Sequence, residues 1–269
     1  MSVQVASADT AVVRVTGEDA AAFLQGQCTA DLRGMGQADA LWLNRKGRVQ
    51  AHTIVVREAD GSFLLLCPHL PAEALVPLVT ANVIADDVVA QDETPRWRRW
   101  LAWGAEPVGP GVRAFATKRY GAPAWDALSP LDADAPGVVA DRAELEAARI
   151  RAGIPSVPAD CGEGEFPQEC GLDAWVSYTK GCYLGQEVMA RIQSMGSLRR
   201  VLRRVESADG AALVAGADLL VAGKAVGKLR SVSDLHGLAL VSLELAEGAR
   251  CDTPAGGVVL GVPAALPAA

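Results

Sequence analysis

The hydrophobic and polar positions in the first quarter of the chain predict several short β-strands. Residues 11–15 alternate weakly between the two kinds, as a strand does, and residues 39–67 have the pattern of a meander with strands at 49–56 and 62–66. Residues 44–47, Asn-Arg-Lys-Gly, are typical of a turn. This part of the chain is therefore predicted to be a sheet of short strands joined by tight turns.

Helices are predicted at three places by their start and stop signals. A Thr-x-x-Asp capping box at Thr16 opens the first helix. The second covers residues 71–79, where an internal proline must bend or shorten it. The third covers residues 142–151, with Asp141 as its cap and Gly153 just past its end. These helices lie between predicted strands, which indicates a mixed α and β fold.

The last quarter of the chain has a different pattern, with short apolar runs separated by glycine. Short strands at this spacing are typical of a small β-barrel or sandwich, so we place a boundary near residue 197. Residues 104–140 are rich in Gly, Pro and Ala, and we expect turns there with a helix near Trp125. Residues 156–172 lack periodicity and are a long loop, ordered or disordered; ordered loops of this length are usually functional. The expected barrel strands are residues 201–205, 219–221, 225–229, 238–243 and 258–262.

Composition narrows the class of protein. The 269 residues suffice for two or three domains, and a hydrophobic fraction of 50% indicates a globular chain. A net charge of −7 argues against nonspecific coating of nucleic acid. No apolar run approaches the roughly 18 residues of a membrane span, and residues 1–9 lack the basic start of a secretory signal. We therefore expect a cytoplasmic protein without a membrane partner.

The six cysteines are scattered, with no Cys-x-x-Cys and no Cys/His pair at zinc spacing. Neither a disulfide framework nor a metal site is expected, and most of these thiols are interpreted as small buried hydrophobes. The alternative is that Cys161 and Cys170 join Cys182 at a cluster or metal.

The densest chemical signal is Lys-Gly-Cys-Tyr-Leu-Gly-Gln-Glu at residues 180–187. The segment that follows is compatible with a helix, and glycines on both sides of Cys-Tyr-Leu permit unusual backbone shapes. Cys182 is therefore predicted at a tight turn that leads into a helix. A helix N-terminus and Lys180 should lower its thiol pKa. The alternative, a buried cysteine in an ordinary turn, explains the spacing equally well.

Three further segments carry weaker signals. In the loop at 166–172, Glu169 beside Pro and Gly can be a rigid acceptor for the paired N–H donors of a pterin, although a solvated surface glutamate is the commoner case. Residues 23–31 read as a helix end followed by a polar turn, and residues 44–48 as a basic turn. The mixture of Arg and Trp at 96–103 suits base stacking, but a strand with Trp inside and Arg outside is more usual.

Together these segments resemble the YgfZ family, which is related to the aminomethyltransferase (T-protein) of the glycine cleavage system. Residues 180–187 match the family signature fully, and weaker similarity covers most of the chain. The resemblance implies an α+β fold: a ring of α/β folate-binding, T-protein-like domains with a small C-terminal β-barrel. The corresponding domains are residues 1–95, residues 96–197 with the signature, and residues 198–269 as the barrel.

The resemblance also implies the function and the site. It indicates a protein that binds tetrahydrofolate or a one-carbon derivative, supports iron–sulfur cluster assembly or repair through client or assembly proteins, and takes part in tRNA modification. Glu169 takes the place of the glutamate that holds the pterin, with Cys170 where alanine is usual. The expected reactive site comprises Cys182, Lys180, Tyr183, Gln186, Glu187 and Arg191. The expected folate site comprises Glu169, Gln25, Thr29, Asp31, Arg48 and Gly181.

One departure from the transferases bears on catalysis. They carry an aspartate pair in the strand after the glycine-containing turn, and Ala51 and His52 stand at those positions here. The general acid/base carboxylate is absent unless His52 replaces it, and a lone histidine in a strand is more often packed. Three hypotheses follow: a folate-dependent accessory factor for iron–sulfur clusters, a one-carbon transferase or demethylase, and a tRNA- or protein-binding module without chemistry.

Overall fold

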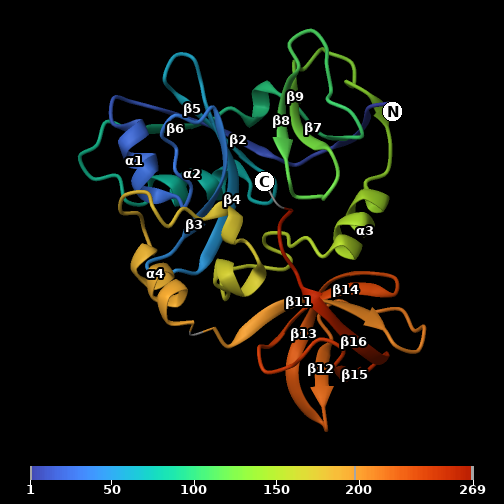
Figure 1. Cartoon of the computed structure of the whole chain (residues 1–269). Helices are drawn as coiled ribbons and strands as arrows, with labels where there is room; N and C mark the ends of the chain where they lie inside the picture. The colour runs from blue at the N-terminus through green and yellow to red at the C-terminus, as the bar shows by residue number, and fades with distance from the viewer. Residues whose placement is uncertain (1, 197, 268–269) are drawn as a thin grey trace. The chain divides into compact units, whose positions relative to one another are not determined.

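The computed structural model describes residues 2–196 and 198–267, which form two compact units (Figure 1). Unit 1 contains Met1–Thr117, Ala122–Asp141 and Trp175–Val188. Unit 2 contains Lys118–Gly121, Arg142–Ala174 and Met189–Ala269. The chain therefore passes between the units several times. Among the described residues, no helix is long and apolar enough to cross a membrane.

The first sheet of unit 1 is antiparallel and confirms the predicted meander. Two helices, α1 (Ala20–Gln27) and α2 (Ala72–Thr80), cover one of its faces and bury Phe23 and Leu75 against it. The strands, in spatial order, are β3 (Gln37–Leu43), β4 (Val49–Arg57), β5 (Phe63–Cys67), β2 (Ala11–Thr16) and β6 (Val89–Asp92).

The second sheet of unit 1 packs on the face of the first sheet that the helices leave free. Phe115 and Leu128 of this sheet share a core cluster with Ile54 and Leu64 of the first. Trp125 lies in strand β9, so the prediction of a helix near it is wrong. Successive residues of this segment point to opposite faces of the sheet, and both faces are covered, which favours a strand over a helix. The strands, in spatial order, are β10 (Val138–Val139), β1 (Gln4–Ser7), β7 (Arg98–Trp103), β9 (Ala124–Ser129) and β8 (Arg113–Thr117).

Unit 2 holds the predicted barrel, drawn in orange to red in Figure 1. Its interior is an apolar cluster that includes Leu219, Leu229, Val241 and Val258. Five of its strands correspond to predicted runs, and the sixth, β15, was missed because only one of its four residues is buried. The closed order is β11 (Arg200–Ser207), β14 (His236–Ser242), β13 (Lys224–Ser233), β12 (Asp218–Val221), β15 (Arg250–Thr253) and β16 (Gly256–Pro263).

Helix α3 (Ala143–Ala152) leads into the long loop, which is ordered and contains the short 3-10 helices η2 (Pro167–Cys170) and η3 (Asp173–Trp175). A third 3-10 helix, η1 (Thr94–Arg96), precedes β7, and α4 (Gln186–Met195) follows the signature. The mixed α+β class with a C-terminal barrel is therefore confirmed.

Two predicted helix caps are wrong. The N-cap of α1 is Asp19, but its carboxylate accepts a hydrogen bond from the distant backbone N–H of Asp87, at 2.8 Å, and caps no N–H of the helix. The N-cap of α3 is Arg142 rather than Asp141. At the other end of α3, Gly153 has a φ of 76° and closes the helix as predicted. The C-terminal end of α3 could be predicted because it depends on the backbone conformation of one glycine. The two N-caps could not, because they depend on the partners of side chains.

Candidate functional site

The signature segment folds as a turn that leads directly into helix α4, as its glycines predict. Gly185 has a φ of 84°, and a Cβ there would lie 2.7 Å from the backbone oxygen of Asn44. Only glycine fits this position, because a side chain would meet backbone. Gly181 differs from the prediction, since a Cβ there would have no atom within 4 Å and its backbone needs no positive φ. The requirement for glycine thus comes from one of the two flanking positions.

Cys182 is exposed, whereas the other five cysteines are buried. All six lie in the described part of the chain, so this contrast covers every thiol of the protein. The interpretation of Cys182 as a buried cysteine in an ordinary turn is therefore wrong. Lys180 and Tyr183, which flank the exposed pair Gly181 and Cys182, are only 3% and 6% exposed. The turn presents the thiol outward while the Lys180 and Tyr183 side chains point into unit 1.

Lys180 is buried beneath this turn. Its Nζ donates hydrogen bonds to the backbone oxygens of Cys28, at 2.9 Å, and Ala30, at 2.5 Å, and lies 5.2 Å from the centre of the Tyr183 ring. Burial lowers the pKa of Lys180 below its ordinary value. The ammonium group therefore binds the segment 28–30 to the signature turn, which is a different task from the charged surrounding of Cys182 that the sequence predicted.

The segment 25–31 is held by its own side chains. Gln25 donates from Nε2 to Asp31 Oδ1 at 3.0 Å and accepts from the backbone N–H of Leu32 at 2.8 Å. Asp31 also pairs with Arg33 at 2.7 Å, and that hydrogen-bonded guanidinium lowers the pKa of the Asp31 carboxyl. Two residues predicted to bind folate are thus engaged with each other.

Thr29 is fully buried and joins the same segment to distant parts of unit 1. Its hydroxyl donates to the backbone oxygen of Trp175 at 2.6 Å and accepts from the N–H of Leu41 at 2.9 Å. The N–H of Ser177 donates to the oxygen of Thr29, and the N–H of Leu184 donates to the oxygen of Gly26. The predicted segments 23–31, 44–47 and 180–187 are therefore brought together in unit 1.

The remaining signature side chains order the turn or face solvent. Gln186 accepts from the backbone N–H of Tyr183 at 3.3 Å and so helps to order the turn. The buried hydroxyl of Tyr183 has no hydrogen-bond partner among the described residues, and burial, with a smaller effect of Cys28, raises its pKa to about 12. Glu187 and Arg191 are exposed on α4. Arg48 is half-buried, and its N–H donates to Asn44 Oδ1 at 3.1 Å.

Glu169 lies in unit 2 and is 4% exposed, so the solvated surface glutamate is ruled out. Oε1 accepts from Arg200 Nε and Oε2 from a terminal nitrogen of the same guanidinium, both at 3.0 Å. The N–H of Phe166 donates to Oε2 at 2.9 Å. The carboxylate is rigid, as predicted, but Arg200 occupies its two oxygens. Sequence reasoning missed Arg200, which is one of several arginines at the start of β11.

His52 is packed, which was the more usual expectation for a lone strand histidine. It is 1% exposed, stacks on the ring of Trp175 with centroids 4.1 Å apart, and has Nε2 2.8 Å from Asp39 Oδ1. Asp39 and Trp175 were not singled out from the sequence. Trp175 is far from His52 in the chain and Asp39 lies on the neighbouring strand β3, so no single local pattern reveals this arrangement.

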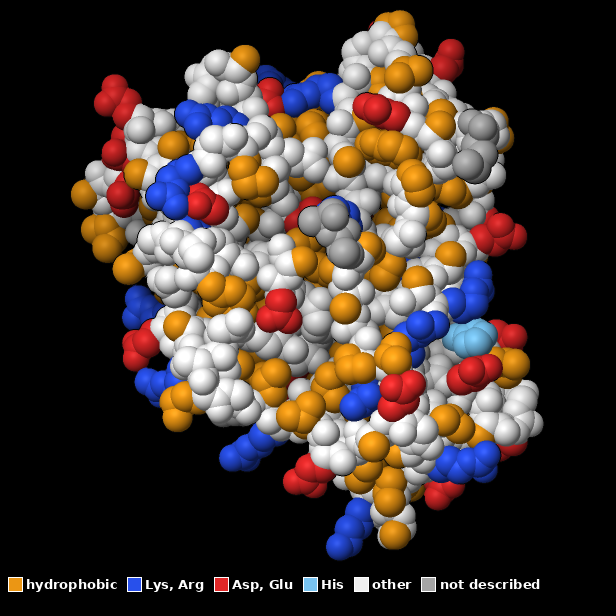
Figure 2. Space-filling model, in the orientation of Figure 1, with side chains coloured by type: hydrophobic (Ala, Val, Ile, Leu, Met, Phe, Trp, Pro, Cys, Tyr) orange, Lys and Arg blue, Asp and Glu red, His pale blue; other side chains and the backbone are white. Residues whose placement is uncertain are grey.

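In the Arg- and Trp-rich run, Arg98 and Trp100 follow the more usual prediction of a strand with Trp inside and Arg outside. Trp100 is buried in the core of the second sheet, and Arg98 is exposed with its guanidinium 4.9 Å from the Trp100 ring. On the face in Figure 2, acidic and basic side chains are interspersed and form no continuous basic stripe. Stacking on Trp100 by an RNA base would require opening that core.

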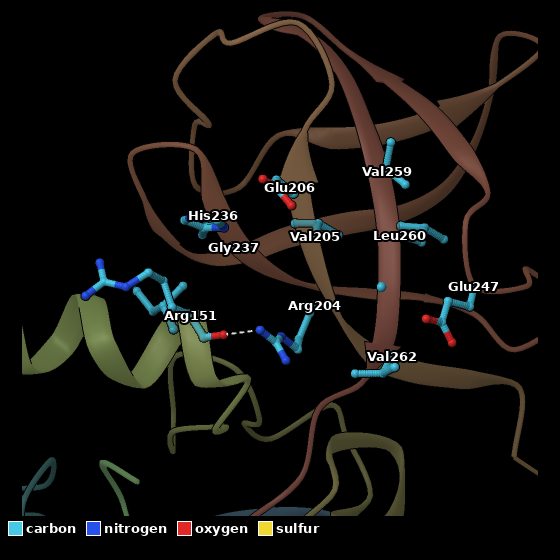
Figure 3. A pocket seen from close by; sticks show the side chains of 12 residues that line it. Arg151, Arg204, Val205, Glu206, His236, Gly237, Glu247, Val259, Leu260 and Val262 are labelled. Carbon is cyan, nitrogen blue, oxygen red and sulfur yellow. Dashed lines mark hydrogen bonds between the residues drawn. The ribbon is translucent and has the colours of Figure 1, made fainter. Parts of the chain in front are cut away.

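Unit 2 contains a cavity of about 300 Å³ between the end of α3 and strands β11 and β16 (Figure 3). Arg204 reaches from β11 and donates to the backbone oxygen of Arg151, while Glu206, His236 and Glu247 line other parts of the wall. None of the residues expected in the reactive site or the folate site lines this cavity. Among residues 2–196 and 198–267, no group of three or more His, Cys, Asp or Glu is placed to hold a metal ion.

Comparisons with known proteins agree on one family. The model of the CAF17 C-terminal beta-barrel domain matches residues 187–267. The chain is 30% identical over 279 residues to the iron-sulfur cluster assembly factor IBA57, mitochondrial, of Mus musculus, covering 88% of this chain and 77% of that protein. It is also 30% identical over 227 residues to the tRNA-modifying protein YgfZ of Edwardsiella ictaluri, covering 71% and 66%.

A solved structure supports the fold. The glycine cleavage system aminomethyltransferase T from Bartonella henselae superimposes with a TM-score of 0.82, covering 97% of this chain and 85% of that one. The sequence identity is 15%, so this likeness concerns the fold alone.

Proposed function

The chain belongs to the family that contains IBA57 and YgfZ, and from this premise we propose that it is a folate-binding accessory protein for iron–sulfur cluster assembly or repair. Relatives named IBA57 are described as iron–sulfur cluster assembly factors, and relatives named YgfZ as tRNA-modifying proteins. A second role in tRNA modification belongs to the same proposal. The location we propose is cytoplasmic, although the IBA57 relatives are named as mitochondrial, and cell fractionation tests it.

The observation that carries the proposal is that some residues of the signature are buried and hold the turn, while the thiol of Cys182 is exposed. Lys180, Tyr183 and Gly185 fix the turn through buried contacts, and Cys182 alone among the cysteines is exposed. A thiol on a rigid, exposed turn can attack an electrophile or ligate iron without moving the backbone. One thiol does not complete the ligand set of a cluster, so the remaining ligands come from a client or assembly protein. This suits an accessory role with the cluster as cargo.

The folate half of the proposal depends on Glu169. A pterin offers two adjacent N–H donors to a carboxylate, and the Nε and terminal nitrogen of Arg200 present the same paired donors to Glu169 now. The carboxylate therefore has the geometry for such an edge, provided that Arg200 withdraws. Glu165 offers the guanidinium another acceptor, since its Oε1 lies 3.7 Å from Arg200. Folate, when bound, would supply a one-carbon carrier, and Glu169 would orient its ring.

Calorimetry with tetrahydrofolate tests this half. We expect wild type to bind, Glu169→Gln to lose at least about tenfold in affinity through loss of a charged acceptor, and Arg200→Ala to bind more tightly because the competing donor is gone. Arg199→Ala, an exposed neighbour, is the matched control. Equal affinity of all four proteins would remove Glu169 from the site, and no binding by wild type would end the folate proposal.

The transferase alternative is supported by the fold, but the proposed position of its acid holds no carboxylate. Ala51 is buried, and His52 is packed on Trp175 and paired with Asp39. A steady-state assay for methylene-tetrahydrofolate with methylamine donors decides between the two functions. Turnover above background would favour the transferase, and restoration of iron–sulfur enzyme activity in a deletion strain without such turnover would favour the accessory role.

A further inference from the structure

Two buried thiols in the long loop of unit 2 lie together and take no part in the proposed function. Cys161 and Cys170 are both fully buried. Cys170 Sγ lies 3.6 Å from the backbone oxygen of Asp160, the residue before Cys161, and Cys161 Sγ lies 3.9 Å from the oxygen of Phe166. Cys170 Sγ therefore lies beside the peptide bond that leads into Cys161, and Cys161 Sγ lies beside the start of the 3-10 helix η2 that carries Cys170. The pair thus closes the segment 162–169 at its base.

The backbone at Cys161 is fixed by a buried ionic network. The Asp160 carboxylate accepts from Arg149 at 2.8 Å and from the backbone N–H groups of Ser156 and Ser231, both at 3.0 Å. Asp160 is fully buried, and Arg149 is 1% exposed. Cys161 therefore follows directly from an anchored residue and has little freedom to turn away.

The backbone at Cys170 is fixed separately. Glu169 before it is held by Arg200, and Gly171 after it packs against the chain end, where a Cβ would lie 2.1 Å from the oxygen of Ala264. The N–H of Leu266 donates to the oxygen of Gly171 at 3.2 Å. Two independent anchors thus fix the backbones of the two cysteines beside each other, and an intrachain disulfide needs such closely placed backbones.

The reduced pair is well suited to persist until an oxidant arrives. Burial, followed by the neighbouring Cys170, Glu165 and Glu169, raises the pKa of the Cys161 thiol well above its ordinary value. The Cys161 and Cys170 thiols make long contacts to carbonyl oxygens, at 3.9 Å and 3.6 Å. Formation of an S–S bond would sacrifice little, and the rate of reaction would be set by opening of the segment 162–169.

We propose that Cys161 and Cys170 are a redox modification site that forms a reversible intrachain disulfide with a small-molecule disulfide as oxidant. One cysteine thiolate attacks the oxidant, releases its first thiol and forms a mixed disulfide. The second cysteine displaces the remaining thiol. Both cysteine sulfurs are oxidised, the S–S bond of the oxidant is reduced, and the two protons leave on the two released thiols. The disulfide closes the segment that carries Glu165 and Glu169, and it does not depend on the proposed folate or cluster role.

The test maps thiols on the full chain. Exposed Cys182 is first blocked by alkylation of the native protein, which is then incubated with oxidised glutathione, unfolded, and alkylated with a second reagent. We expect loss of two alkylatable thiols, at Cys161 and Cys170, a single peptide linking them, and recovery of both thiols with dithiothreitol. Cys161→Ser and Cys170→Ser should each abolish the link. Cys67→Ser, which removes another buried thiol, should leave it.

Repeating the incubation in urea below the unfolding transition speeds local opening and tests access to the thiols. Formation of the link under native conditions or in this dilute urea supports the proposal. Both thiols remaining free in both conditions would contradict it. A stable glutathione adduct on either residue, or a link that forms only in the unfolded chain, would contradict it as well.

Discussion

Lys180 in unit 1 and Arg149 in unit 2 are both buried cations, at 3% and 1% exposure, but their surroundings compensate the charge differently. Lys180 meets two neutral backbone oxygens and an aromatic ring, and burial lowers its pKa. Arg149 meets the carboxylates of Glu146 and Asp160, whose combined effect outweighs burial and raises its pKa. The positive charge of Arg149 in unit 2 is therefore neutralised by carboxylates. The positive charge of Lys180 in unit 1 is only solvated by backbone dipoles.

This difference separates the structural role of Arg149 from the role of Lys180 in positioning the candidate site. The Arg149 network joins α3, the long loop and β13, because Arg149 also donates to the oxygen of Ile154 at 2.6 Å and to the Ser231 hydroxyl at 2.9 Å. Lys180 joins two short segments beneath one exposed thiol. Removal of the first cation leaves a buried carboxylate unpaired, while removal of the second leaves only polar backbone oxygens.

The largest effect is expected for Arg149→Met. Asp160 would remain fully buried without its countercharge, so we expect a loss of about 3–5 kcal/mol in the free energy of unfolding. Urea unfolding of the full chain measures it. Arg151→Ala, an exposed arginine on the same helix, is the control and should change the stability by less than about 0.5 kcal/mol. Equal effects of the two variants would show that the network is not what stabilises unit 2.

A smaller loss is expected for Lys180→Met. Two backbone oxygens lose a donor, but the cost of burying an ammonium group disappears, which leaves a net loss of about 1–2 kcal/mol in the free energy of unfolding. Urea unfolding compares it directly with Arg149→Met. A larger loss of unfolding free energy for Lys180→Met than for Arg149→Met would contradict the comparison. It would mean that the backbone dipoles around Lys180 stabilise a buried cation as well as the carboxylates around Arg149 do.

Tyr183 makes unit 1 sensitive to alkaline pH. Its pKa is raised to about 12 in the folded state, above an ordinary value of about 10, so its contribution to stability is present below pH 10 and is lost as pH rises toward 12. The expected loss across this window is about 2 kcal/mol in wild type relative to Tyr183→Phe. Urea midpoints at pH 9 and pH 11.5 measure it, and parallel pH profiles for the two proteins would contradict it.

The smallest effect concerns the exposed pair Asp31–Arg33. The hydrogen-bonded guanidinium lowers the Asp31 pKa, so its contribution to stability is present above pH 4 and is lost as pH falls through the lowered value. Arg33→Ala should raise the Asp31 pKa toward about 4 with little change in stability at neutral pH, because exposed pairs are screened by water. An NMR titration of the carboxyl carbon reports it. An unchanged pKa would assign the shift to Gln25 and the backbone instead.

The sequence predicted what depends on local pattern. The meander, the barrel strands and the turn before α4 follow from alternation and glycine, and each was found. It did not predict the partners of the buried polar side chains. The direction of Lys180, the partner of Glu169 and the stacking of His52 on Trp175 all depend on segments far apart in the chain. The cap predicted for α1 failed for the same reason, since the Asp19 carboxylate accepts a hydrogen bond from the distant N–H of Asp87.

The central claim is that a fixed turn presents Cys182 for iron–sulfur work, and one rescue measurement tests it most directly. Wild type, Cys182→Ser and the exposed α4 control Gln193→Ala are expressed at matched levels in a strain that lacks the protein, and the activity of an iron–sulfur enzyme is measured. Because Cys182 is exposed, its variant should fold with an unchanged melting temperature. The account predicts that Gln193→Ala restores the activity and that Cys182→Ser restores less than about a tenth of it. Full restoration by Cys182→Ser would contradict the account.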